Sequence, residues 1–111
     1  MRPQGSRRTV AEQWHTDREH EMTVAMILDN PKGSQEIYER IRTLVGVDRP
    51  AGGICHLAGP RPEGGWRVIE VWESEEQAQR FYEERVRPAA EAVGVTPPPP
   101  PELWAVHRYA T

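Results

Sequence analysis

The order of strand-type and helix-type segments predicts an α+β protein with a ferredoxin-like βαββαβ arrangement. Four short segments are rich in β-forming residues, and two segments between them repeat apolar residues at helical spacing. Each helical segment starts after a serine, a residue that caps helix N-termini, and is followed by glycine and proline. We therefore expect a four-stranded antiparallel sheet with both helices on one face.

The first half of this pattern is a strand, a helix and a second strand. The segment 22–29, MTVAMILD, is almost continuously apolar and suits a strand covered on both faces. After the turn NPKG, Ser34 is the expected N-cap of a helix over 35–45. One stripe of that helix is apolar: Ile37, Ile41, Leu44 and Val45. The glycines and prolines of 46–53 end it, and GICHLAG at 53–59 is the second strand.

The second half begins after the loop PRPEGG with a strand over 66–73, WRVIEVWE. Ser74 and Gln77 form a capping box that starts the second helix. Its expected inner side consists of Ala78, Phe81, Tyr82 and either Arg85 or Val86. Pro88 should break or kink this helix, and a further turn or two should end at Gly94.

Five consecutive prolines, 97–101, lead into the last strand. Such a run favours an extended polyproline II conformation, so we interpret it as a stiff connector. The segment that follows, LWAVHRYA at 103–110, is expected to be the fourth strand.

Composition and length argue against several classes of function. The chain has 111 residues, enough for one domain, and a net charge of −3, with a single lysine and scattered arginines, which does not suit a nucleic-acid partner. No apolar run is long enough to span a membrane. The single cysteine, Cys55, cannot form an internal disulfide, so we expect a cytoplasmic protein. Residues 1–21 lack periodicity and are expected to be a flexible extension of a domain over 22–111; Met22 is an alternative translation start.

Alternation along the strands divides their side chains between two faces of the sheet. In the third strand Trp66, Glu70 and Trp72 share one face, and Ile69 and Val71 share the other. We assign Ile69 and Val71 to the helix-covered core, which places the tryptophans and Glu70 on the open face. The same reasoning puts three more residues of the neighbouring strands there: His56, His107 and Tyr109.

An open face with two tryptophans is too apolar to remain in water. A two-fold homodimer with the two sheets face to face would cover it and enclose a cavity lined by the polar residues of that face. We expect the small-molecule pocket either inside this dimer or between the sheet and the helices. Glu70 also has two structural interpretations: a position near the wet edge of the strand, or an ion pair with an arginine across the interface.

The chain also resembles a known family. The element order, the length from Met22 onward, and the run GGWRVIEVWESEEQAQRFYEERVRPA at 64–89 are similar to the dimeric α+β barrel superfamily, and within it to the antibiotic-biosynthesis monooxygenase (ABM)-like family. The resemblance covers residues 22–109 and includes the segment GICHLAG. It implies a dimeric α+β barrel.

Members of this family include cofactor-independent oxygenases of polyketide-like phenols, haem-degrading enzymes, isomerases and proteins of unknown role. The haem degraders carry an asparagine, tryptophan and histidine set. Here the only asparagine is Asn30 and no histidine lies in the second helix, so the resemblance does not extend to haem degradation. In the cofactor-free oxygenases tryptophan, asparagine and arginine surround the cavity, and Trp66 or Trp72 matches these in kind.

The leading functional hypothesis is a monooxygenase-like enzyme without a cofactor, acting on an aromatic or polyketide-like substrate. His56 and Glu70 lie on neighbouring antiparallel strands, so they can form the pair that removes a proton from a phenol or an acidic carbon. The anion would react with dioxygen directly. Trp66 and Trp72 would hold the substrate and exclude water, and His107 and Tyr109 would complete the wall.

Three alternatives belong to different classes of function. His56, Glu70 and His107 have the residue types of a two-histidine, one-carboxylate metal site, although no metal-binding spacing accompanies them. A second alternative is a non-catalytic dimer that binds a hydrophobic ligand, and a third is an isomerase or cyclase on the same fold. Each histidine also has a purely structural interpretation.

Overall fold

A computed structural model describes residues 22–46 and 48–111, and the expectations for residues 1–21 lie outside this part. The strands are β1 (Val24–Asn30), β2 (Gly53–Pro60), β3 (Trp66–Trp72) and β4 (Glu102–Ala105). The helical segments are α2 (Gln35–Val45), α3 (Glu75–Phe81), the π-helical turn η1 (Tyr82–Val86) and α4 (Arg87–Ala92). The order confirms the predicted βαββαβ fold. None of these helices, within the part described, has the length and apolar character that a membrane span requires.

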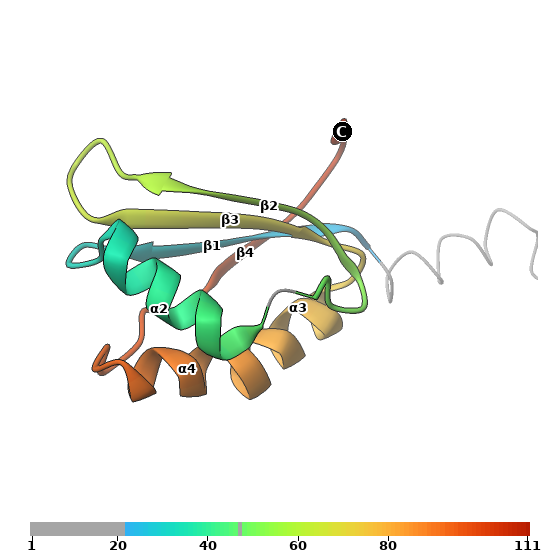
Figure 1. The fold of residues 1–111 in the computed structure, drawn as a ribbon. Helices are drawn as coiled ribbons and strands as arrows, with labels where there is room; N and C mark the ends of the chain where they lie inside the picture. Colours follow the sequence, from blue (N-terminus) through green and yellow to red (C-terminus); the bar gives the residue numbers. More distant parts are fainter. Residues whose placement is uncertain (1–21, 47) are drawn as a thin grey trace, which may run out of the picture.

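The four strands form one antiparallel sheet in the order β2-β3-β1-β4. Figure 1 shows α2, α3 and α4 on the same side of it, as predicted. The register sets His56 opposite Glu70 on β2 and β3, and Asn30 opposite Trp66 on β1 and β3. These two pairs position most of the candidate site.

β4 is shorter than the predicted strand at 103–110. It lies at the edge of the sheet and pairs only with β1, which begins at Val24. The last bond on this side joins the Val106 N–H to the Thr23 carbonyl. Beyond it the described residues offer no neighbouring strand, so residues after Val106 leave the sheet. Figure 1 shows the C-terminus projecting away from the side that carries the helices.

The serine caps are present as predicted. The Ser34 hydroxyl accepts a hydrogen bond from the Ile37 N–H at 3.2 Å and begins α2. Ser74 accepts from the Gln77 N–H at 3.2 Å and donates to the Gln77 side-chain oxygen at 2.9 Å, which begins α3. Both caps satisfy backbone donors that the first helical turn leaves free.

Pro88 widens the second helix instead of breaking it. The Arg87 N–H bonds to the carbonyl of Tyr82, five residues back, and this bond closes the π-helical turn η1. Proline lacks an N–H and its ring crowds the carbonyl four residues earlier, so a wider turn just before Pro88 relieves both problems. The helix then continues as α4.

The hydrophobic core lies between the sheet and the helices. Its buried members are Val24, Met26, Trp72, Ala78 and Tyr82. Trp72 is on the helix-covered face, and by alternation so are Glu70, Val68 and Trp66.

The prediction that Trp66, Glu70 and Trp72 lie on the open face of the sheet is therefore wrong. Alternation correctly separated the two groups of residues but did not show which group meets the helices. The wide aromatic side chains fill the space beneath α2 and α3, whereas Ile69 and Val71 lie on the open face. Leu57 and Trp104, which pair with open-face residues Ile69 and Ala25, are exposed there.

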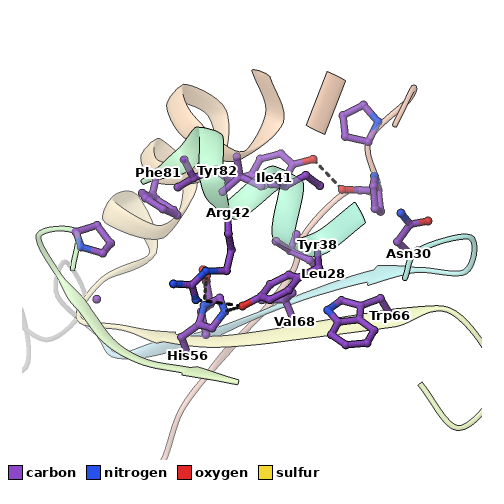
Figure 2. A pocket seen from close by; sticks show the side chains of 18 of the residues that line it. Leu28, Asn30, Tyr38, Ile41, Arg42, His56, Trp66, Val68, Phe81 and Tyr82 are labelled. Atoms are coloured by element: carbon purple, nitrogen blue, oxygen red, sulfur yellow. Dashed lines mark hydrogen bonds and ion pairs between the residues drawn. The ribbon is translucent and has the colours of Figure 1, made fainter. Parts of the chain in front are cut away.

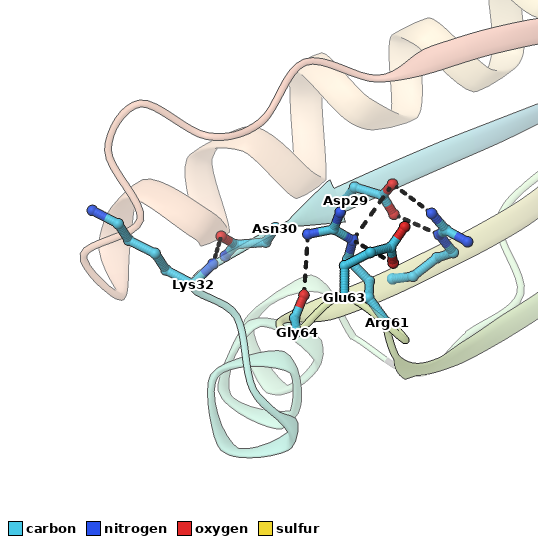
Figure 3. A network of polar contacts seen from close by, with 7 residues as sticks. Asp29, Asn30, Lys32, Arg61, Glu63 and Gly64 are labelled. Atoms are coloured by element: carbon cyan, nitrogen blue, oxygen red, sulfur yellow. Dashed lines mark hydrogen bonds and ion pairs between the residues drawn. The ribbon is translucent and has the colours of Figure 1, made fainter.

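A polar network joins the β2–β3 hairpin to the end of β1 (Figure 3). Arg67 donates to both oxygens of Asp29, at 2.8 and 2.9 Å, across the β1–β3 pair. Arg61 lies 3.8 Å from Asp29 and donates to the Gly64 carbonyl at 3.1 Å. The hydrogen bonds from Arg67 hold the pKa of Asp29 below its ordinary value, so this carboxylate stays charged at neutral pH.

Candidate active site

A cavity of about 290 Å³ lies between the sheet and the helices. Strands β1, β2 and β3 form its floor, α2 and the η1 region form its roof, and the proline segment closes one end (Figure 2). Most of its wall is apolar or aromatic, including Leu28, Ile37, Ile41, Val68, Phe81, Val86, Pro98 and Pro99. Its size and lining suit a small ring-containing molecule.

A continuous chain of hydrogen bonds runs along one wall of the cavity (Figure 2). The Tyr38 hydroxyl lies 2.5 Å from Nε2 of His56. Nδ1 of His56 lies 2.9 Å from one carboxylate oxygen of Glu70. The other oxygen accepts from the indole N–H of Trp72 at 3.0 Å. The chain thus leads from a cavity hydroxyl to a buried carboxylate.

The side chains of this hydrogen-bonded chain become more exposed from Glu70 to His56. Glu70 is only 7% exposed, and both of its oxygens are engaged. The side chain of His56 is 38% exposed, and the cavity lies beside it. A buried carboxylate is tolerated where hydrogen-bond donors surround it, and the two donors here hold Glu70 in one position behind His56.

Helix α2 brings two further polar side chains to the same wall. Tyr38 and Arg42 are four residues apart and therefore lie on the same side of the helix. Arg42 donates to the Tyr38 hydroxyl at 3.4 Å, and its guanidinium carbon lies 5.9 Å from the ring centre. This hydrogen bond raises the pKa of Arg42, which keeps the guanidinium charged.

Aromatic rings enclose the site. The Tyr38 ring lies between His56 and Trp66, with centroid distances of 5.9 and 5.6 Å. Trp72 and Phe81 pack together at 5.1 Å on the core side. The indole N–H of Trp66 is buried and has no partner among the described residues. The rings therefore restrict water and offer flat surfaces to a planar ligand.

The structure brings together four of the six residues that the sequence proposed for the site. His56, Glu70, Trp66 and Trp72 all line the cavity, and His56 contacts Glu70 as expected. Their cavity lies between the sheet and the helices of a single chain, which is one of the two locations expected from the sequence, although we expected these four side chains on the open face.

His107 and Tyr109 are not part of this cavity. Both are exposed and follow Ala105, where β4 ends. They do not complete the wall of this cavity, because the fourth strand stops before it reaches them. The hypothetical metal set of His56, Glu70 and His107 is likewise not assembled, and residues 22–46 and 48–111 contain no group of three or more potential ligands placed to hold a metal ion.

Sequence reasoning missed Tyr38 and Arg42. We treated helix 35–45 only as an apolar stripe, although Tyr38 follows Ile37 and Arg42 follows Ile41. A polar pair that accompanies such a stripe at a spacing of four residues is the signal that identifies them.

Comparison with known proteins supports the fold. No family model matches the chain, and no curated protein matches its sequence. Among solved structures it is similar to SnoaB, a cofactor-independent oxygenase from Streptomyces nogalater, crystallised as an asparagine-to-alanine mutant. The match has a TM-score of 0.51 and 16% sequence identity, and it covers 80% of this chain and 95% of SnoaB. At that identity the likeness is one of fold.

Proposed function

We propose that this chain is a cofactor-independent, monooxygenase-like enzyme acting on a small aromatic or polyketide-like molecule. The observation that carries the proposal is the hydrogen-bonded chain from Tyr38 through His56 to Glu70 on the wall of a mostly apolar cavity. Such an arrangement is suited to proton removal, which is the step that makes a phenol or an acidic carbon reactive. The fold shared with SnoaB is consistent with the oxygenation that would follow.

Tyr38 is the group that meets the substrate in this proposal. Both ring nitrogens of His56 are already engaged, one by Glu70 and one by Tyr38. With its proton on Nδ1, facing the carboxylate, the imidazole accepts through Nε2. The Tyr38 oxygen takes the substrate proton while its own proton passes to Nε2. This follows the logic of a hydroxyl activated by a histidine that a carboxylate orients.

Charge then rests on the substrate anion and on the imidazolium of His56. Glu70 stabilises the imidazolium because its carboxylate is buried beside it at 2.9 Å. The guanidinium of Arg42, next to the Tyr38 hydroxyl, adds a positive charge near the substrate anion. The apolar wall limits competition from water.

The oxygenation balances with dioxygen as the only oxidant. A phenolic or enolised carbon that carries one hydrogen forms a C–O bond to one oxygen atom. This bond becomes a C=O double bond as the carbon gives up four electrons, the pair of the anion and the pair of its C–H bond, and the O–O bond breaks. The other oxygen atom takes the hydrogen of that C–H bond as a proton, together with the proton held by His56, and leaves as water. For anthrone the products are anthraquinone and one molecule of water.

Oxygen uptake with anthrone tests this proposal. We expect quinone and oxygen consumption in a one-to-one ratio, and at least about a hundredfold lower rate for His56→Ala. His107→Ala is the matched control, because His107 is exposed and outside the cavity, and it should retain the wild-type rate. Equal rates for both histidine variants would overturn the proposal.

Measurements of deuterium exchange and binding with the same compound, anthrone, separate the alternative functions. Deuterium exchange at the acidic carbon without oxygen uptake would indicate an isomerase or cyclase. Anthrone binding with neither exchange nor oxygen uptake would indicate a ligand-binding protein. Either result would overturn the oxygenase proposal.

A further inference from the structure

The side chains around the cavity offer hydrogen-bond donors but few free acceptors. Both oxygens of Glu70 are occupied, the Asn30 oxygen accepts from the Lys32 N–H, and the Ser34 hydroxyl accepts from the Ile37 N–H. Three donor groups on the wall are still able to bind a ligand. Among the described residues the Asn30 amide and the Trp66 indole N–H donate no hydrogen bond, and the Arg42 guanidinium donates only a long one.

Arg42 is the strongest of these donors. It is half-buried and lines the cavity, and its only side-chain hydrogen bond among the described residues is the long one to Tyr38, at 3.4 Å. It forms no ion pair within residues 22–46 and 48–111. By contrast Arg67, Arg80 and Arg87 each contact a carboxylate. Figure 2 shows the Arg42 guanidinium next to His56 and the Tyr38 hydroxyl.

Among the described residues no carboxylate forms an ion pair with Arg42; Glu39, three residues earlier on α2, adds a favourable charge but is exposed. Asp48 and Arg49 also line the cavity, both exposed, and they add one charge of each sign. Glu70 is directed to His56 and Trp72. The cavity therefore has an apolar body and a positive charge at one part of its wall, and this pattern is complementary to a ligand with an anionic oxygen group.

We infer that the cavity selects flat aromatic molecules that carry a carboxylate, and that Arg42 binds this group. The inference rests on the proposed function and specifies its substrate class. A guanidinium matches a carboxylate with two parallel hydrogen bonds, and aromatic rings on the wall contact the remainder of the molecule. The carboxylate also places the reacting part of the ring system near the Tyr38 oxygen, because Arg42 and Tyr38 are in contact.

A binding comparison between two molecules of the same shape tests this inference without any turnover. The probes are 2-naphthoate, which is anionic at neutral pH, and 2-naphthamide, which is neutral. By isothermal titration calorimetry at low salt, we expect the wild-type chain to bind 2-naphthoate at least about tenfold more tightly. The preference should shrink at about 0.5 M salt because Arg42 is only half-buried.

Variants of the same helix supply the controls. Arg42→Gln should reduce the preference to less than about threefold, whereas Arg42→Lys keeps the charge and should retain part of it. Arg40→Gln removes an exposed arginine of α2 that is not on the cavity wall, and it should bind both probes as the wild type does. If Arg42→Gln fails to fold, the Arg42→Lys result and the wild-type preference still decide the question.

Three results would overturn the inference: equal affinity of the wild type for the two probes, no measurable binding of 2-naphthoate, or an undiminished preference in Arg42→Gln. None of these depends on catalysis. Anthrone oxidation that requires His56, combined with equal binding of the two probes, would leave the proposed function standing. A clear preference for 2-naphthoate without anthrone oxidation would support the carboxylate site and contradict the proposed oxygenase function.

Discussion

Glu70 is the residue whose environment differs most from the sequence-based expectation. Its pairing with His56 was predictable, because register and alternation place the two residues opposite each other on β2 and β3. Its burial beneath the helices was not. Period-two alternation sorts a strand into two groups, and the choice between faces depends on packing against α2 and α3, which no single strand encodes.

Removing the Glu70 carboxylate should expose its structural role. Glu70→Ala leaves the buried N–H of Trp72 without an acceptor, so we expect a loss of about 1–3 kcal/mol in the free energy of unfolding. Glu70→Gln keeps an oxygen for Trp72 and should lose less. Urea unfolding of both variants measures the difference. Equal stabilities would show that the Trp72 hydrogen bond contributes little.

At the scale of the elements, most boundaries followed from local chemistry. The caps at Ser34 and Ser74 come from residues within one helical turn, and such signals are readable in sequence. Pro88 was expected to break or kink its helix, and the π-helical turn that accommodates it was not predicted. The end of β4 is different, because it depends on where β1 begins to offer pairing partners. That is a contact between segments about 80 residues apart.

The proline segment is attached to the helix layer through one hydroxyl. Tyr82, in η1, donates to the Pro99 carbonyl at 2.7 Å. We expect Tyr82→Phe to lower the free energy of unfolding by about 1 kcal/mol and to loosen one end of the cavity. Thermal or urea unfolding near pH 8, well below the tyrosine pKa of about 10, measures this loss. A variant as stable as the wild type would contradict it.

The same pair provides a pH test with a defined sign. Burial raises the pKa of Tyr82 because it disfavours the phenolate. A raised pKa stabilises the folded state below the ordinary tyrosine pKa of about 10, and this stabilisation is lost as pH rises toward the folded value. The stability gap between wild type and Tyr82→Phe should therefore narrow as the pH rises from about 9 to about 11. A constant gap would argue against a buried, protonated hydroxyl.

For the whole molecule, the open sheet face is the surface that carries exposed large apolar side chains. We propose that a second copy of the chain covers it in a two-fold homodimer. Leu57 and Trp104 are 58% and 48% exposed on this face, next to Ile27, Ile69 and Val71. The C-terminus projects away from the helices, on the side of this face (Figure 1). The cavity is formed within one chain, so the proposed dimer is not needed to complete it.

Light scattering after size-exclusion chromatography tests the dimer. We expect the wild type to be dimeric at micromolar concentration and Leu57→Asp to be monomeric, because a buried unpaired charge opposes association. Leu44→Asp is the matched control, since Leu44 is 56% exposed but lies on α2. A monomeric wild type, or equal dissociation by both variants, would contradict the proposal.

In the proposed reaction the Tyr38 oxygen, supported by His56 and Glu70, removes a proton from a molecule in the cavity. Anaerobic incorporation of deuterium from solvent into the acidic carbon of anthrone measures this step without oxygen. We expect Tyr109→Phe, altered at an exposed tyrosine outside the cavity, to exchange at the wild-type rate, and Tyr38→Phe to exchange at least about a hundredfold more slowly. Wild-type exchange by Tyr38→Phe would contradict the claim.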